Sequence, residues 1–134
     1  MRKILLLFVP VLLCCSSGFS QHIPQWTVVQ TIHLTEQTSP VDPTNIFTPT
    51  TTSLYRLEVY IACGGEISFG QGSWSVTAAS ENRGGITLTC GRNTGAASPY
   101  VVSPALGTPV TYAVAQTGTP KFVYNLDIVV EQLK

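Results

Sequence analysis

The feature that most constrains the fold is a stretch of alternating side chains at residues 54–63, LYRLEVYIAC. Arg56 and Glu58 fall on one side of an extended strand there, and an unbroken series of apolar side chains falls on the other. A period of two with aromatic and β-branched residues is the strongest signal for a strand that buries one face. The pattern therefore predicts a β-strand whose inward face consists of Tyr55, Leu57, Val59, Ile61 and Cys63.

The first 20 residues have the pattern of a secretory signal peptide. Two basic residues open the chain, an apolar run of 12 residues (4–15) follows, and Gly18 and Ser20 suit the small-residue positions before a cleavage site. The run is too short to span a bilayer as a helix. We expect residues 1–20 to form a cleaved signal helix, and the protein to be secreted, periplasmic or displayed at the cell surface.

A lipoprotein anchor at Cys14 or Cys15 is the alternative interpretation, although Leu13 and Cys14 stand where a small residue usually precedes the lipidated cysteine. Cleavage leaves residues 21–134, which we expect to form a single β-sandwich domain. This part carries five basic and seven acidic residues, a net charge of −2. Because it has no basic patch or polybasic segment, we expect no binding to nucleic acid and no attachment to an anionic membrane surface.

Strand patterns follow one another along the mature chain, separated by turns rich in glycine and proline. No helical period of 3.6 residues remains after the signal segment. About eight short strands predict an all-β fold, an antiparallel sandwich or barrel. We expect the main strands at residues 26–34, 54–63, 73–79, 86–90, 100–102, 109–115 and 121–131, with a loop at 91–97.

Residues 35–53 are rich in threonine and proline. Proline cannot donate a hydrogen bond to a sheet, so a central strand is excluded there. A glycosylated stalk is one interpretation of this composition. We favour a surface connection with a short edge strand near Ile46 and Phe47, because these two apolar residues can dock onto a core.

The segments 46–49 (IFTP) and 54–60 (LYRLEVY), together with 109–114 (PVTYAV) and 124–133, resemble small β-sandwich proteins found among phage virion proteins and in bacterial genomes. The tyrosine-led strand also resembles its counterpart in tumour-necrosis-factor-like jelly rolls. The resemblance covers most of residues 44–133 and consists of hydrophobic positions. It implies a jelly-roll-like sandwich, often trimeric, that acts as a structural or adhesive module, and it supplies no catalytic residues. A signal peptide favours an exported bacterial version.

Cys63 and Cys90 are the cysteines left after cleavage, and both fall at strand ends on inward faces. The exported context favours their oxidation. A disulfide between them would close a loop of about 28 residues and stabilise the fold by about 3–4 kcal/mol; two buried free thiols are the alternative. We expect no metal site or cofactor, since there is no C-x-x-C spacing and only His22 and His33 are available as further soft ligands.

The residues that could carry catalysis are scattered along the chain. Ser73 lacks the G-x-S-x-G elbow of a hydrolase, and His33 falls on an outward face. Residues 70–72, Gly-Gln-Gly, lack the third glycine and the helix of a dinucleotide site. The acids that a glycosidase or a calcium site would need are spread over the mature chain: Glu58, Glu66, Glu81 and Asp127. We therefore expect that the protein is not an enzyme.

Aromatic side chains supply the remaining candidates for binding. Tyr60 falls on an outward strand face and Tyr100 lies near a loop, so these two could stack against a sugar or be covered in an oligomer interface. The other strand aromatics fall on inward faces and are expected in the core: Trp26, Tyr55, Trp74, Tyr112, Phe122 and Tyr124.

Together these features predict an exported, non-enzymatic β-sandwich that acts as a structural or interaction module in adhesion or assembly. We expect a homo-oligomer, a trimer if the chain follows the resemblance, with a glycan or a protein as a further partner. A small carbohydrate-binding module is the alternative function. A small secreted hydrolase is a third class, for which the sequence shows no assembled site.

Overall fold

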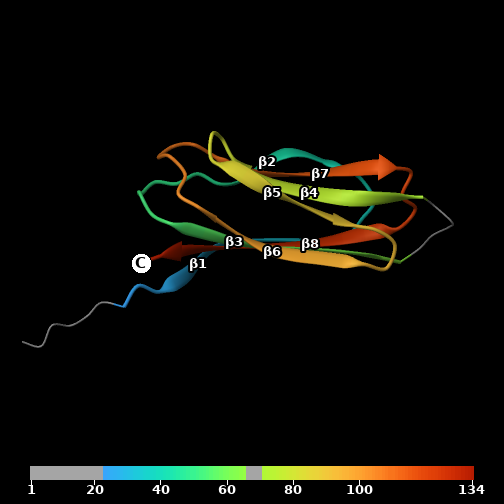
Figure 1. Ribbon diagram of the computed structural model, residues 1–134, viewed down its shortest axis with the longest axis horizontal. Helices are drawn as coiled ribbons and strands as arrows, with labels where there is room; N and C mark the ends of the chain where they lie inside the picture. The colour runs from blue at the N-terminus through green and yellow to red at the C-terminus, as the bar shows by residue number, and fades with distance from the viewer. Residues whose placement is uncertain (1–22, 66–70) are drawn as a thin grey trace, which may run out of the picture.

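The computed structural model describes residues 23–65 and 71–134, so the predicted signal segment, His22 and Glu66 lie outside the described residues. The described chain forms two four-stranded antiparallel sheets that pack face to face (Figure 1). Their strands are β1 (Trp26–Gln37), β2 (Val41–Phe47), β3 (Tyr55–Gly64), β4 (Gly72–Ser80), β5 (Gly84–Cys90), β6 (Gly95–Val102), β7 (Val110–Gly118) and β8 (Val123–Leu133).

The strand order is that of a jelly roll. One sheet has the order β1-β8-β3-β6 and the other has the order β2-β7-β4-β5. Among the described strands, β4 and β5 are the one consecutive pair that lies in the same sheet, and every other connection crosses from one sheet to the other. The predicted fold class, an all-β antiparallel sandwich with about eight strands, is confirmed.

The centre of the first sheet is the ladder between β3 and β8, and its inward side chains form the core. Leu57 lies opposite Val130, and Ile61 lies opposite Leu126, and all four side chains are fully buried. The alternation in residues 54–63 therefore has the predicted inward face. Three residues of the second sheet, Trp74, Val76 and Val114, complete this core. Burying each large apolar side chain stabilises the folded state by about 1.5–3 kcal/mol.

A disulfide joins Cys63 at the end of β3 to Cys90 at the end of β5, with 5.7 Å between the two Cα atoms. It therefore ties one sheet to the other. An aromatic pair packs beside it, because Trp74 is the cross-strand neighbour of Cys90 and Tyr124 is that of Cys63. The Trp74 and Tyr124 ring centroids are 4.9 Å apart, and the indole N–H donates to the Phe122 carbonyl at 3.0 Å.

The prediction for the first strand is wrong at its beginning. The pairing of β1 with β8 shifts between Val28 and Gln30, so one extra residue enters the strand as a β-bulge. Trp26 and Val28 consequently lie on the outer face, where Trp26 was expected in the core. Gln30, which interrupts the apolar pattern in the sequence, lies on the inner face opposite Val130.

Two edge strands are longer than their sequences predicted. The edge strand near Ile46 is confirmed and extends over all of β2. The predicted loop at 91–97 is wrong in its last part, because β6 begins at Gly95 and pairs with β3. Pro99 is accommodated because β6 has a neighbour on one side only, which leaves an unpaired edge where no N–H is needed.

Removing the disulfide tests how much this bond between the two sheets contributes to the unfolding free energy. We expect the Cys63→Ala/Cys90→Ala double variant to lose about 3–4 kcal/mol of unfolding free energy in urea titration, because its unfolded chain regains the freedom of an open loop. The wild type measured with a reductant should show a similar loss. Alkylation mass spectrometry of the native protein should find no free thiol at these positions, and finding two would contradict the disulfide.

Candidate functional site

Tyr60, the first of the two predicted binding aromatics, lies on the outer face of the β1-β8-β3-β6 sheet and is 46% exposed. Its ring leans along the sheet toward β6, because a Cβ atom built on Gly95 would lie 3.5 Å from the tyrosine hydroxyl. The ring thus covers the surface that a glycine leaves open. The exposed part of Tyr60 is therefore an aromatic surface.

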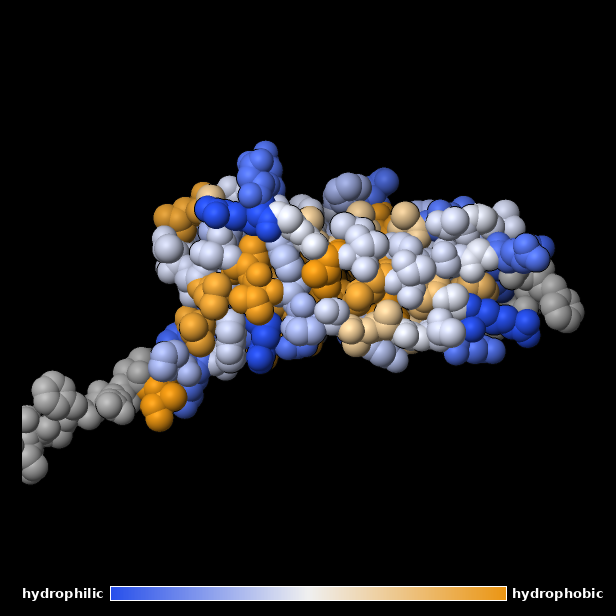
Figure 2. All heavy atoms as spheres, viewed as in Figure 1, coloured by the Kyte–Doolittle hydropathy of each residue, from blue (hydrophilic) through white to orange (hydrophobic). Residues whose placement is uncertain are grey.

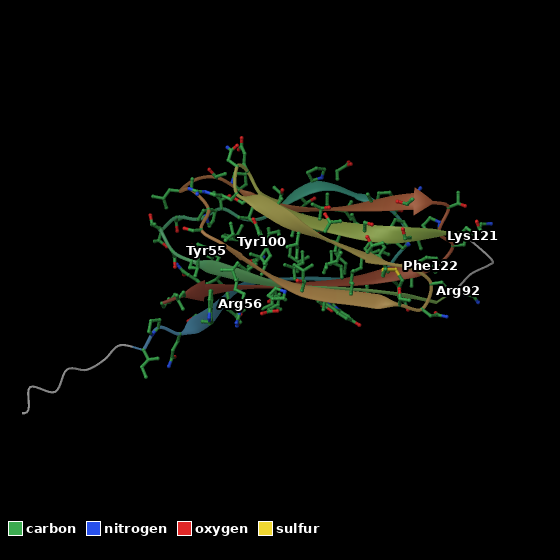
Figure 3. The ribbon with its side chains drawn as sticks, in the orientation of Figure 1. Tyr55, Arg56, Arg92, Tyr100, Lys121 and Phe122 are labelled. Atoms are coloured by element: carbon green, nitrogen blue, oxygen red, sulfur yellow. A yellow bond between two sulfur atoms is a disulfide. The ribbon has the colours of Figure 1, made fainter. Side chains whose placement is uncertain are left out.

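Tyr100, the second candidate, is only 9% exposed and belongs to the core, so the expectation of an accessible ring is wrong for this residue. Its side chain lies between the sheets (Figure 3), and its hydroxyl donates to the Gly84 carbonyl at 2.6 Å. Burial raises the pKa of the Tyr100 hydroxyl, and the backbone of Ser80 partly opposes the shift. Burial likewise raises the pKa of Tyr124, which donates to Ser39.

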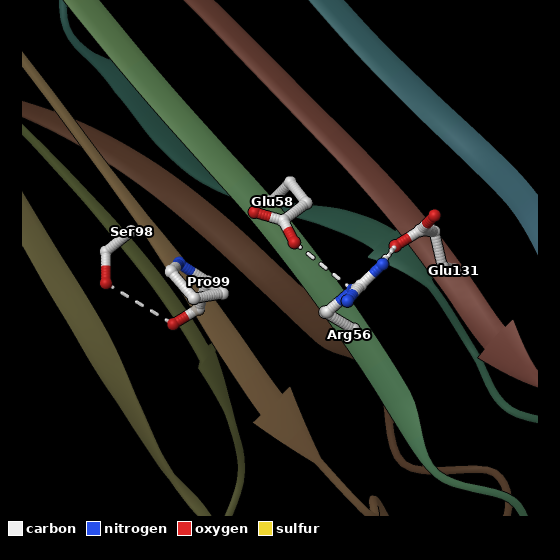
Figure 4. A network of polar contacts seen from close by, with 5 residues as sticks. All are labelled: Arg56, Glu58, Ser98, Pro99 and Glu131. Carbon is white, nitrogen blue, oxygen red and sulfur yellow. Dashed lines mark hydrogen bonds and ion pairs between the residues drawn. The ribbon is translucent and has the colours of Figure 1, made fainter. Parts of the chain in front are cut away.

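The outer face of the first sheet carries an ionic cluster on its two central strands, near the end where β3 begins (Figure 4). Arg56 Nη2 lies 2.6 Å from a Glu131 carboxylate oxygen, and Arg56 Nε lies 3.1 Å from Glu58. The guanidinium carbon is also 4.8 Å from the centroid of the Trp26 ring, which gives a cation–π contact. Arg56 therefore satisfies two carboxylates and fixes the tryptophan that the bulge of β1 turned outward.

The outward side chains of the first sheet form rows that run across the strands. One row runs across all four strands as Val28, Glu131, Arg56 and Val101, so the ionic pair has an exposed valine on each side. Another row runs as His33, Asp127, Tyr60 and Ala97, in which the His33 imidazole binds the Asp127 carboxylate.

The outer face of the second sheet has a different chemistry. Its side chains are small and uncharged along β4, β5 and β7, and hydroxyl groups pair across the strands. Ser75 lies 2.7 Å from Thr89, and Thr77 lies 2.9 Å from Thr87. The two outer faces are thus unequal, because one combines exposed apolar side chains with ion pairs and the other is covered by hydroxyl groups.

A pocket of about 240 Å³ opens at the end of the sandwich opposite the disulfide. Sequence reasoning missed it, because its walls come from β1, β2, β3, β8 and the segment between β2 and β3. The one sequence signal was Gln30, the polar residue on an otherwise apolar strand face. The lining residues are Val29, Gln30, Phe47, Thr48, Thr50, Thr51, Tyr55 and Gln132.

Within residues 23–65 and 71–134, no group of three or more His, Cys, Asp or Glu side chains is placed to hold a metal ion. In the same part of the chain, no helix has the length and apolar character needed to cross a membrane. The disulfide indicates an extracytoplasmic protein, since such bonds persist in oxidising compartments.

The fold and the disulfide define the class of the protein, an extracytoplasmic all-β sandwich with jelly-roll strand order. No family model, no curated protein and no solved structure matches the chain.

Matched substitutions of the two tyrosines test their different surroundings. Tyr100→Phe should lower the unfolding free energy by about 1 kcal/mol, because the Gly84 carbonyl loses its donor. Tyr60→Phe should change it by less than about 0.5 kcal/mol, since the exposed hydroxyl has no such partner among the described residues. Urea unfolding followed by tryptophan fluorescence measures both, and equal effects would contradict the placement of Tyr100.

Proposed function

We propose that this protein is an exported, non-enzymatic interaction module that assembles with further copies of itself through the outer face of the β1-β8-β3-β6 sheet. Assembly of this kind suits a structural or adhesive component at the cell surface or in the periplasm. The observation that carries the proposal is the difference between the two outer faces of the sandwich.

Three exposed large apolar side chains lie on the proposed contact face. Val28, Tyr60 and Val101 are 56%, 46% and 51% exposed and all project outward from the first sheet. In the described part of the chain, the outward side chains of β4, β5 and β7 include none of comparable size. The tyrosine and the arginine on this face are of the residue types that are enriched at protein interfaces.

The charged side chains of Arg56 and Glu131 are compatible with burial in an interface between two copies. Arg56 and Glu131 pair with each other in the single chain, so burial would not leave the arginine without a counter-ion. Apolar atoms also run along the seam between the sheets, on the side where the edge strands β5 and β6 lie (Figure 2). A seam of one copy against the outer face of the next would give a heterologous contact, which closes into a ring such as a trimer when the rotation between successive copies is a whole fraction of a turn.

Export is supported by the signal pattern of residues 1–20 together with the disulfide. On the outer face of the first sheet, the His33 imidazole binds the Asp127 carboxylate. A nucleophilic site would need a hydroxyl or thiol hydrogen-bonded to that imidazole, and the described residues supply none.

Placing one charge on each outer face tests the assembly. The wild type should elute as an oligomer in size-exclusion chromatography with light scattering, and Val101→Glu should elute as a monomer. Its carboxylate would face Arg56, which already pairs with Glu131 and Glu58, so a third carboxylate would be buried without a counter-ion of its own. Thr77→Glu makes the same change in charge on the opposite face and should leave the oligomer intact. A wild type that is monomeric at about 100 μM would overturn the proposal.

A further inference from the structure

We propose that the pocket at the open end of the sandwich binds a neutral sugar residue. It lies on the inner side of the first sheet, where Tyr55 projects between the two sheets (Figure 3), and so it is separate from the proposed contact face. The proposal does not rest on oligomerisation.

The walls of the pocket are held in place by specific bonds. The Gln132 side chain donates to the Thr51 hydroxyl at 3.0 Å and to the Tyr55 hydroxyl at 3.4 Å. Ser53 donates to the Leu133 carbonyl at 2.9 Å, and the Gly107 N–H donates to the Pro49 carbonyl at 3.0 Å. The segment between β2 and β3 is therefore fixed at both ends, and the pocket is formed before any ligand arrives.

The polar groups of the pocket are amides and hydroxyls. Gln30 and Gln132 each offer a carbonyl acceptor and an N–H₂ donor, and Thr48, Thr50 and Thr51 offer hydroxyls that can do either. None of the lining side chains is charged. A charged ligand would lose its hydration without gaining a counter-ion, whereas the hydroxyls of a neutral sugar match this set of partners.

An aromatic pair supplies the apolar part of the site. The Phe47 and Tyr55 ring centroids are 4.7 Å apart with their planes tilted by 38°. A sugar ring has apolar C–H faces as well as polar hydroxyls, so one face can pack against aromatic carbon while the edges bind the amides. A volume of about 240 Å³ lies below that of pockets for drug-sized ligands, which indicates a single ring.

Two hydrogen-bonding groups in the pocket are available to a ligand. Among residues 23–65 and 71–134, the Gln30 side chain forms no hydrogen bond, although the β-bulge turns it toward the inner side of the sheet. The Tyr55 hydroxyl accepts from Gln132 and donates its own proton to no described group. Both groups border the same space, so a sugar hydroxyl can bind there without displacing an existing bond.

The experiment is a titration of the ¹⁵N-labelled mature protein with the methyl glycosides of glucose, galactose, mannose and N-acetylglucosamine, with methyl glucuronate as the charged comparison. At least one neutral glycoside should give saturable shifts of the Thr50, Thr51 and Gln132 amides, with a dissociation constant of about 1–10 mM. The glucuronate should bind at least about tenfold more weakly, because the pocket has no cation to pair with it.

Two variants localise the binding. Gln30→Leu should weaken it by about tenfold, because the Gln30 side chain has no structural partner to lose and would lose its bond to the ligand. Thr50→Phe should abolish binding by filling the pocket from its exposed rim. Gln116→Leu, the same substitution as the first variant at an exposed position on β7, should leave the affinity unchanged.

The proposal is overturned if none of the four glycosides produces saturable shifts at about 50 mM. It is also overturned if the shifts centre on Tyr60 or if Gln30→Leu binds as well as the wild type. The Val101→Glu variant should bind the glycoside as the wild type does, which separates failure of the pocket from failure of the assembly.

Discussion

The antiparallel ladder between β3 and β8 is the interaction on which the other strands depend. It runs from Tyr55 opposite Gln132 to Gly64 opposite Val123 without a register shift. β1 pairs with β8 and β6 pairs with β3, so both edge strands of the first sheet depend on these two central strands. The inward side chains of the same ladder form one side of the core, and Cys63 on β3 forms the disulfide to the second sheet.

The parts of the fold that follow strict alternation were predictable from the sequence. Residues 54–63 and the last strand bury one face without interruption, and a period of two is enough to assign their inner sides. Trp26 was misplaced because a bulge inverts the alternation, and its position depends on the partner strand. The beginning of β6 was missed because glycine and alanine have little strand preference, and pairing with β3 decides their conformation.

The surfaces were harder to predict than the core, because they depend on which strands become neighbours. The row of Val28, Glu131, Arg56 and Val101 draws on four strands, and the sequence does not reveal the strand order that aligns them. The pocket is built in the same way from distant segments. Gln30 was visible in the sequence as a polar residue in an apolar strand pattern. Its place in a pocket could not be inferred, because the segment between β2 and β3 forms another wall of that pocket. Tyr100 was expected at the start of a short strand near a loop, yet β6 begins five residues earlier, at Gly95, and carries its side chain into the core.

The pairing of β1 with β8 has a consequence for how the chain reaches its folded state. The first and last strands lie side by side, and the backbones of Gln25 and Lys134 exchange hydrogen bonds of 2.8 and 2.9 Å. A chain that emerges from a translocation channel with its N-terminus first therefore cannot complete its first sheet until the last strand has arrived. The β4–β5 hairpin is the one pair in the described chain that needs no distant partner. Because non-local pairing is slow, we expect the first sheet to close late in folding, after the β4–β5 hairpin has formed.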